Sequence, residues 1–220
     1  MNVSFSSQMV NLLAALLLLI AFAMLSQRRV LSLIKLLAWQ GAALAAATFI
    51  VAWSTGQQHL YLSVTLTVLL KVILIPWLLH RLIDKLNVRW DVETLINIPA
   101  MMLVGIGLVI FAFSLATPIS QMAGAFTRST LGIALASILL AFLMMIVRRK
   151  AVPQVIGFLA MENGLLFAAT SATYGMPLVV ELGIALDVLV GTLIFGIFFF
   201  HLREAFDSLD IRHMEKLKQD

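Results

Sequence analysis

Residues 131–170 read LGIALASILLAFLMMIVRRKAVPQVIGFLAMENGLLFAAT, and the pattern that organises the whole chain is clearest here. An uninterrupted apolar run is followed by the basic cluster Arg148–Lys150, and a second apolar run carries Glu162 and Asn163 near its middle. A membrane-spanning helix needs about 20 mostly apolar residues, and basic residues gather at the cytoplasmic ends of such helices. This stretch therefore predicts two membrane-spanning helices joined by a short cytoplasmic turn.

The composition of the whole chain agrees with a membrane protein. Of the 220 residues, 62% are apolar and 12% are charged, whereas soluble domains are about 45–50% apolar and about 25% charged. The mean hydropathy is +1.04. These values exclude an ordinary soluble enzyme, a disordered chain and a nucleic-acid-binding protein. There is no cysteine, which excludes disulfides, a thiol nucleophile and iron–sulfur ligation. We expect no cofactor, no metal and no active site in this chain.

Seven apolar stretches are long enough to cross a bilayer. They cover residues 5–25, 30–54, 59–80, 96–117, 127–147, 153–173 and 179–201. Of the 15 basic residues, thirteen lie at alternate turns or in the C-terminal tail, so that all thirteen fall on one side of the membrane. Arg128 falls on the other side, and Lys71 lies within a span. The positive-inside rule makes the basic side cytoplasmic. The sequence thus predicts an all-α polytopic membrane protein with its N-terminus outside and its C-terminus in the cytoplasm.

Spans one to three resemble spans five to seven. The pairs Arg28 and Arg148, Gln40 and Asn163, and His80 and His201 recur at offsets of 120 to 123 residues. Because four spans separate the copies, both would have the same orientation, which defines a parallel repeat; chance similarity between apolar segments is the alternative. The resulting division is a first three-helix unit (1–82), a cytoplasmic loop and connector helix (83–125), a second three-helix unit (126–203) and a cytoplasmic tail (204–220).

Three ionisable residues, Lys71, Glu162 and Asp187, lie close to the midpoints of predicted spans. A charge at the bilayer centre costs about 2.5–3.5 kcal/mol on insertion scales. Such residues are tolerated where they face protein or water, pair with one another, or become neutral. Gln40 lies at the same depth in the second span. Together these four residues predict a polar layer in the middle of the membrane.

Five further residues are expected to support this layer: Asn163, Thr67, Pro76, Gly183 and Gly191. Gly183 and Gly191 share a helix face with Asp187, and small residues on that face let another helix approach closely. Pro76 removes a backbone hydrogen bond in the middle of a helix. The sequence therefore predicts a kink beside Lys71, through which water could reach the lysine.

The polar layer suggests a path for protons or cations. A desolvated carboxylate can take up and release a proton, and a lysine within reach modulates it as an opposite charge. The alternative is a static pair between Lys71 and one acid that holds the bundle together. Three ionisable groups and an amide at one depth exceed what a single structural pair needs, which favours the path.

Several motifs resemble the hydrogenase-4 component E family. These are Gln154-x-x-Gly157-Phe158, Met161-Glu162-Asn163-Gly164, Val180-Glu181-Leu182-Gly183-Ile184-Ala185-x-Asp187, Lys71-Val72-x-Leu74-x-Pro76 and Leu209-Asp210. The resemblance covers most of the chain and is strongest between Gln154 and Asp187. In that family the last three helices are similar to the K-type subunit of complex I and the C-type subunit of multisubunit antiporters. Glu162 and Asp187 match the two membrane acids of the K-type subunit, and this chain adds four N-terminal spans.

The resemblance implies a non-redox membrane subunit of a complex I-like respiratory assembly, such as a formate hydrogenlyase or membrane-bound hydrogenase. Such a subunit lies in a bacterial or archaeal inner or plasma membrane. Its implied partners are other membrane-arm subunits, including antiporter-like proteins, and a cytoplasmic hydrogenase module. The expected activity is proton relay through Glu162, Asp187, Lys71 and Gln40. A purely structural or assembly subunit is the rival hypothesis, and a stand-alone small-solute carrier is a third.

Overall fold

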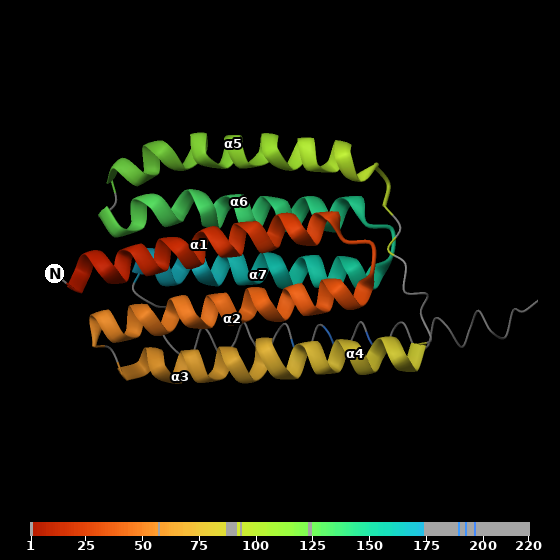
Figure 1. Ribbon diagram of the computed structural model, residues 1–220, viewed down its shortest axis with the longest axis horizontal. Coiled ribbons are helices and arrows are strands. Elements are labelled where there is room, and N and C mark those ends of the chain that lie inside the picture. Colours follow the sequence, from red (N-terminus) through yellow and green to blue (C-terminus); the bar gives the residue numbers. More distant parts are fainter. Residues whose placement is uncertain are drawn as a thin grey trace, which may run out of the picture.

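The computed structural model describes residues 2–56, 58–86, 92, 94–122, 125–173, 189, 192 and 196, and the regular elements in this part of the chain are all helices. The helices are α1 (Asn2–Ser26), α2 (Val30–Thr55), α3 (Gln58–Thr67), η1 (Val68–Leu74), α4 (Ile75–Leu86), α5 (Ile98–Met122), α6 (Ala125–Val147) and α7 (Ala151–Thr173). Helices α3, η1 and α4 follow one another directly and form one rod (Figure 1).

Six of these helical segments are long and apolar enough to cross a membrane. They correspond to the first six predicted spans. Helices are the expected form, because in hydrocarbon every backbone N–H and C=O must be bonded within its own segment. The seventh predicted span (179–201) lies outside the described residues apart from Leu189, Thr192 and Gly196, each of which is helical. The tail (204–220) also lies outside them.

The fourth predicted span agrees with the apolar stretch Ile98–Pro118, but the sequence prediction was wrong about the residues that follow it. It ended the fourth span at residue 117 and assigned 118–126 to a loop, whereas α5 continues to Met122 and α6 begins at Ala125. Pro118 therefore lies inside α5. The physical reason is that proline fixes φ near the helical value and removes only its own N–H, so a helix can continue past it with one hydrogen bond fewer.

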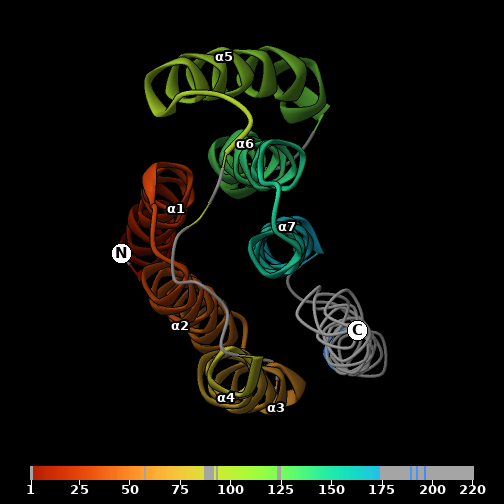
Figure 2. The same cartoon turned by 90° about the vertical axis from the view of Figure 1, so that its right-hand side faces the viewer.

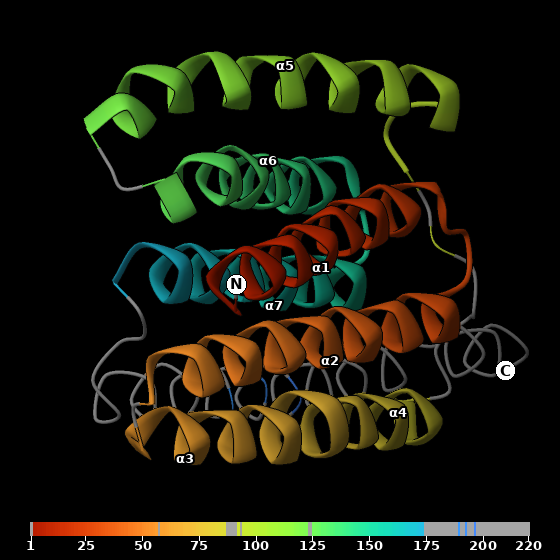
Figure 3. The same ribbon diagram turned by 60° about the vertical axis from the view of Figure 1, so that its left-hand side comes forward.

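Helices α1, α2, α6 and α7 form the centre of the molecule. Helix α1 packs against α2 and α6, and α7 packs against α2 and α6, so the four close a ring (Figure 2). Helix α5 covers the outer side of α6, and the α3–η1–α4 rod lies on α2 at the opposite edge (Figure 3). Helices α1 and α6 run in one direction, and α2 and α7 run in the other. This arrangement is compatible with a parallel repeat, which stays a prediction because its last helix is not described.

The bundle has two distinguishable ends. We call the end that carries residue 2 and the Gly56 turn the N-terminal end, and the end that carries the 27–29 and 148–150 turns the Arg148 end (Figure 1). Gly56 closes α2 with φ 67°, and its N–H bonds to the carbonyl of Ala52 at 2.9 Å. Glycine suits this position because the left-handed conformation costs it little.

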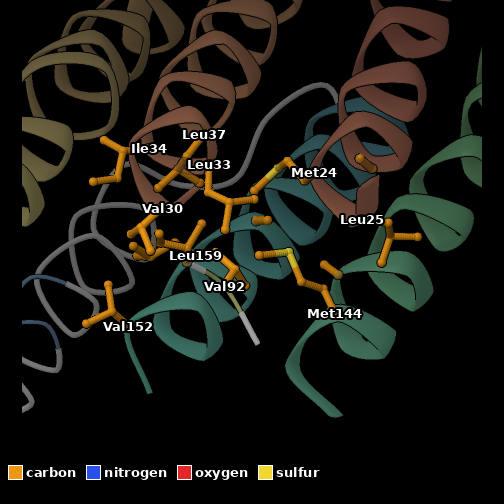
Figure 4. Packing of buried hydrophobic residues seen from close by; sticks show 14 of the residues in the cluster. Met24, Leu25, Val30, Leu33, Ile34, Leu37, Val92, Met144, Val152 and Leu159 are labelled. Atoms are coloured by element: carbon orange, nitrogen blue, oxygen red, sulfur yellow. The ribbon is translucent and has the colours of Figure 1, made fainter. Parts of the chain in front are cut away.

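The apolar core consists of two clusters of buried residues, one toward each end of the bundle. The cluster at the Arg148 end includes Met24, Leu33 and Met144 (Figure 4). The cluster at the N-terminal end is built around Leu17, Leu44 and Phe167, with several alanines that allow close helix contact. A polar layer separates the two clusters, and it contains the candidate site.

Candidate functional site

Lys71 and Glu162 form a buried ion pair in this polar layer. The Nζ of Lys71, on η1, donates to Oε1 of Glu162, on α7, at 2.7 Å. The two side chains are 5% and 6% exposed. A charge-assisted hydrogen bond of this length is among the stronger polar contacts in proteins. The pair brings two opposite charges into the bundle with no net charge, which is the arrangement that a low-dielectric environment requires.

Two amides extend this pair across the bundle. Lys71 Nζ also donates to Oδ1 of Asn163 at 3.2 Å. The Nδ2 of Asn163 in turn donates to Oε1 of Gln40, on α2, at 3.3 Å. Glu162, Lys71, Asn163 and Gln40 therefore form one hydrogen-bonded chain that links α7, η1 and α2. The structure thus brings together four of the residues singled out from the sequence, and their predicted roles stay predictions.

The local backbone brings Lys71 into this chain of contacts. The sequence predicted a break in the helical hydrogen-bond ladder at Pro76, and the structure has a π-helical segment just before it, in which the N–H of Ile75 bonds to the carbonyl of Leu70. Lys71 lies in this segment. Gly41 of α2 faces it, because a Cβ added to Gly41 would lie 3.3 Å from Cβ of Lys71. The absence of a side chain at Gly41 lets η1 approach α2 closely.

Two polar atoms of the layer have no hydrogen-bond partner among the residues that the structure describes. They are Oε2 of Glu162 and Nε2 of Gln40, and both are inaccessible to solvent. Buried polar atoms in native proteins are nearly always bonded to protein or to ordered water. Oε2 of Glu162 and Nε2 of Gln40 can therefore form further hydrogen bonds beyond those among the four side chains.

Three buried hydroxyl residues that were not singled out from the sequence share a cavity with Lys71. Thr48, Ser63 and Thr170 line a cavity of about 20 Å³ together with Lys71 and Thr67. A signal for them exists in the sequence. Thr48 follows Gln40 by eight residues, Ser63 precedes Lys71 by eight, and Thr170 follows Glu162 by eight. Positions i, i+4 and i+8 belong to the same broad stripe of a helix, so Gln40, Lys71 and Glu162 each have a hydroxyl residue in their own stripe.

The remaining predicted site residues divide into two groups. Thr67 lines the hydroxyl cavity, and Pro76 follows the π-helical segment. Asp187, Gly183 and Gly191 lie outside the described residues, so their predicted part in the layer stays a prediction.

A second buried cation lies at the Arg148 end. From the sequence, Arg148 was expected to be a cytoplasmic surface charge, yet it is only 1% exposed. Its Nη2 donates to the carbonyls of Met24 at 3.0 Å and Leu25 at 2.9 Å, in the last turn of α1. Burial lowers the pKa of Arg148 to about 10, so it stays charged at neutral pH. A cation there satisfies carbonyls that a helix C-terminus leaves without partners.

The polar layer offers a cation, a carboxylate and two amides. Among the described residues, no group of three or more His, Asp or Glu side chains is placed to hold a metal ion. The groups that are present can hold charge, accept a proton at a carboxylate oxygen and bond to water.

One relative is similar over almost the whole chain. The uncharacterized protein Rv0085 of Mycobacterium tuberculosis is 32% identical to it over 219 residues, which cover 99% of each chain. No family model matches the chain. No solved structure matches it either.

Proposed function

We propose that this chain, which belongs to the same family as the mycobacterial protein Rv0085, is a non-redox membrane-arm subunit of a complex I-like, ion-translocating respiratory complex. It relays protons through charged side chains in the middle of the membrane. The proposal rests on the resemblance to the hydrogenase-4 component E family and on the chemistry of the polar layer. The electron-transfer centres are in other subunits, because this chain has no cysteine to hold an iron–sulfur cluster.

The buried Lys71–Glu162 ion pair is the observation that supports this proposal most strongly. The pair belongs to two of the six helical segments that can cross a membrane. Ionisable residues inside membrane helices are costly and mark ion pathways by default. Asn163 and Gln40 continue the polar chain sideways through the bundle, and lateral continuity is what a relay between neighbouring subunits needs. Asp187 of the seventh predicted span is the proposed next member.

The orientation and partners follow from the same proposal. The Arg148 end is the cytoplasmic end, because most basic residues of the chain lie at turns on that side. The N-terminus is then outside a bacterial or archaeal inner or plasma membrane. The partners are antiporter-like membrane subunits and a cytoplasmic hydrogenase module. Nickel and iron that copurify with the native complex would support a hydrogenase, and their absence would indicate another relative of complex I.

The decisive experiment is Glu162→Gln in the intact complex. Glutamine keeps the size of the side chain and a hydrogen-bond acceptor for Lys71 but cannot take up a proton. We expect proton translocation per electron transferred to fall strongly while the complex still assembles. The measurement is acidification of inverted membrane vesicles, normalised to electron transfer. Glu93→Gln, between the third and fourth predicted spans, is the matched control for losing a carboxylate elsewhere. Full translocation by Glu162→Gln in a normally assembled complex would refute the relay.

A structural or assembly subunit is the second candidate, and one observation favours it. Lys71 contacts Glu162 and Asn163 directly, as a static pair that holds α7 against η1 would do. Under this hypothesis Glu162→Gln lowers the yield of the complex and leaves translocation per assembled complex unchanged. The two measurements, yield and translocation ratio, therefore separate the candidates.

A further inference from the structure

The ion pair lies between two cavities that differ in size and lining. Toward the N-terminal end, the cavity of about 20 Å³ is lined by the hydroxyl residues Thr48, Ser63, Thr67 and Thr170 as well as by leucines. Toward the Arg148 end, a cavity of about 10 Å³ is bounded by Leu37, Ile75 and Leu159 next to the polar layer itself. A space of roughly 10–15 Å³ is the least that holds a water molecule. The first cavity exceeds this limit, and the second is at or below it.

The hydroxyl groups of the larger cavity are arranged to bind water. The hydroxyl of Thr48 donates to the carbonyl of Leu44 at 3.0 Å, and that of Thr170 donates to the carbonyl of Leu166 at 2.8 Å. Each hydroxyl proton is therefore used within its own helix, and each oxygen is left as an acceptor. A buried water needs two to four polar partners. The two threonine oxygens can accept hydrogen bonds from this water, and the hydroxyl of Ser63 can supply a third hydrogen bond.

The hydroxyl residues also extend from the ion pair in one direction only. Thr48, Ser63 and Thr170 each lie eight residues from a member of the polar layer, which is about 12 Å along a helix, and all three lie toward the N-terminal end. Both ends of the bundle are packed with apolar core residues, those of the Arg148 end beyond Leu37 and Ile75 (Figure 4) and those of the N-terminal end around Leu44 and Phe167. The hydroxyl residues that line the cavity are therefore what distinguishes the two directions.

We propose that the hydroxyl cavity is a water site that connects Lys71 with the aqueous phase at the N-terminal end of the bundle. The ion pair then exchanges with that side of the membrane and is closed toward the Arg148 end. This inference deepens the proposed relay and rests on it for its biological meaning, because it adds an entry or exit for protons at Lys71. The hydration itself is testable without any measurement of pumping.

The absence of cysteine from the native chain makes single-cysteine accessibility a clean test. Ser63→Cys and Thr170→Cys are introduced separately into the intact complex in membrane vesicles. Silver ion is the probe, because it is small, moves through water-filled spaces and binds thiols. The readout is the amount of thiol that still reacts with a fluorescent maleimide after denaturation. Ser54→Cys and Arg149→Cys, both exposed sites at opposite ends, establish which end each face of the vesicle presents.

We expect both cavity cysteines to lose most of their thiol when silver is added on the side of Ser54, and to keep it when silver is added on the side of Arg149. Ala47→Cys is the matched control, because Ala47 precedes Thr48 in α2 but belongs to the apolar core cluster at the N-terminal end. It should stay unreacted from both sides.

Two results would overturn the inference. One is that both cavity cysteines stay unreacted from the Ser54 side in an assembled complex in which Ser54→Cys reacts. The other is that they react equally from both sides, or no faster than Ala47→Cys. If either occurs while Glu162→Gln still abolishes translocation, the relay stands and this route to it is wrong. If the cysteines react as expected while Glu162→Gln pumps normally, the water site stands without the relay.

Discussion

Two cations are buried in the described part of the chain, Lys71 and Arg148, and their polar partners differ. Lys71 lies in the middle of the bundle and is bonded to a carboxylate and an amide from α7. Arg148 lies at one end and is bonded to two main-chain carbonyls from α1. The carbonyl groups at Arg148 cannot change their charge. The carboxylate at Lys71 can, because a proton can add to Glu162 and leave the lysine without a counter-charge.

This difference separates the structural contact of Arg148 from the Lys71–Glu162 pair, which is a candidate functional contact. Arg148 fastens the end of α1 to the α6–α7 turn through main-chain carbonyls, which do not titrate. The Lys71–Glu162 pair depends on the protonation of one partner, and it lies beside a cavity of hydroxyl groups. Burial of a charge by itself therefore says little about function. Whether the contact can change its charge depends on the chemistry of the partner. Three sets of variants test this distinction, and their expected effects on stability decrease from Lys71 to Arg148 to Gly41.

Lys71→Met should have the largest effect on stability. It leaves Glu162 without its counter-charge inside the bundle, and breaking a buried pair in this way costs about 3–5 kcal/mol. The double variant Lys71→Met/Glu162→Leu removes both charges and should recover most of that loss, because apolar replacement of a buried pair is often neutral. The measurement is the free energy of unfolding of the purified protein during titration with sodium dodecyl sulfate, followed by tryptophan fluorescence.

The double variant also bears on function. If the pair is part of the relay, a complex that contains the stable double variant assembles and does not translocate protons. Normal translocation by that complex would make the pair a structural contact like that of Arg148. A double variant as unstable as Lys71→Met would show that the energetic account of the pair is wrong.

Arg148→Leu should have an intermediate effect. The carbonyls of Met24 and Leu25 lose their donor, and an unsatisfied buried acceptor costs about 1–3 kcal/mol. We expect a loss of about 2–4 kcal/mol in the free energy of unfolding. Translocation per assembled complex should stay unchanged. Arg149→Leu is the control, because Arg149 is the next residue in the chain and its side chain is exposed. This variant should change the free energy of unfolding by no more than about 0.5 kcal/mol. A lower translocation ratio for Arg148→Leu would contradict the division between the two cations.

Gly41→Ala should have the smallest effect. The added methyl group would lie 3.3 Å from Cβ of Lys71, so α2 and η1 must separate slightly, at a cost of about 1 kcal/mol. Gly107→Ala is the matched control, because no atom lies within 4 Å of a Cβ added there, and it should be neutral or stabilising through helix propensity. Equal thermal stability of the two variants would show that the approach of η1 to α2 is not tight.

The six described spans were predicted from the sequence to within a few residues at most ends. The fourth span was predicted to end at residue 117, close to the end of the apolar stretch at Pro118, but the helix itself continues to Met122 through residues that the prediction gave to a loop. The π-helical segment around Lys71 was not predicted, since the proline indicated a disturbed ladder but not its form. Lys71, Glu162, Asn163 and Gln40 were recognised as a polar layer from their depth, and Thr48, Ser63 and Thr170 were overlooked because hydroxyl residues are common in membrane helices.

The sequence alone determined which segments are apolar enough to cross a membrane and which polar residues lie at their middles. These properties depend on local composition and on length along one helix. Only the tertiary structure decided which polar groups meet, because contacts between helices depend on how each one is rotated and packed. Lys71 and Glu162 are 91 residues apart in the chain, and Arg148 is more than 120 residues from the carbonyls that it binds. Their pairing is a result of packing that no local pattern contains.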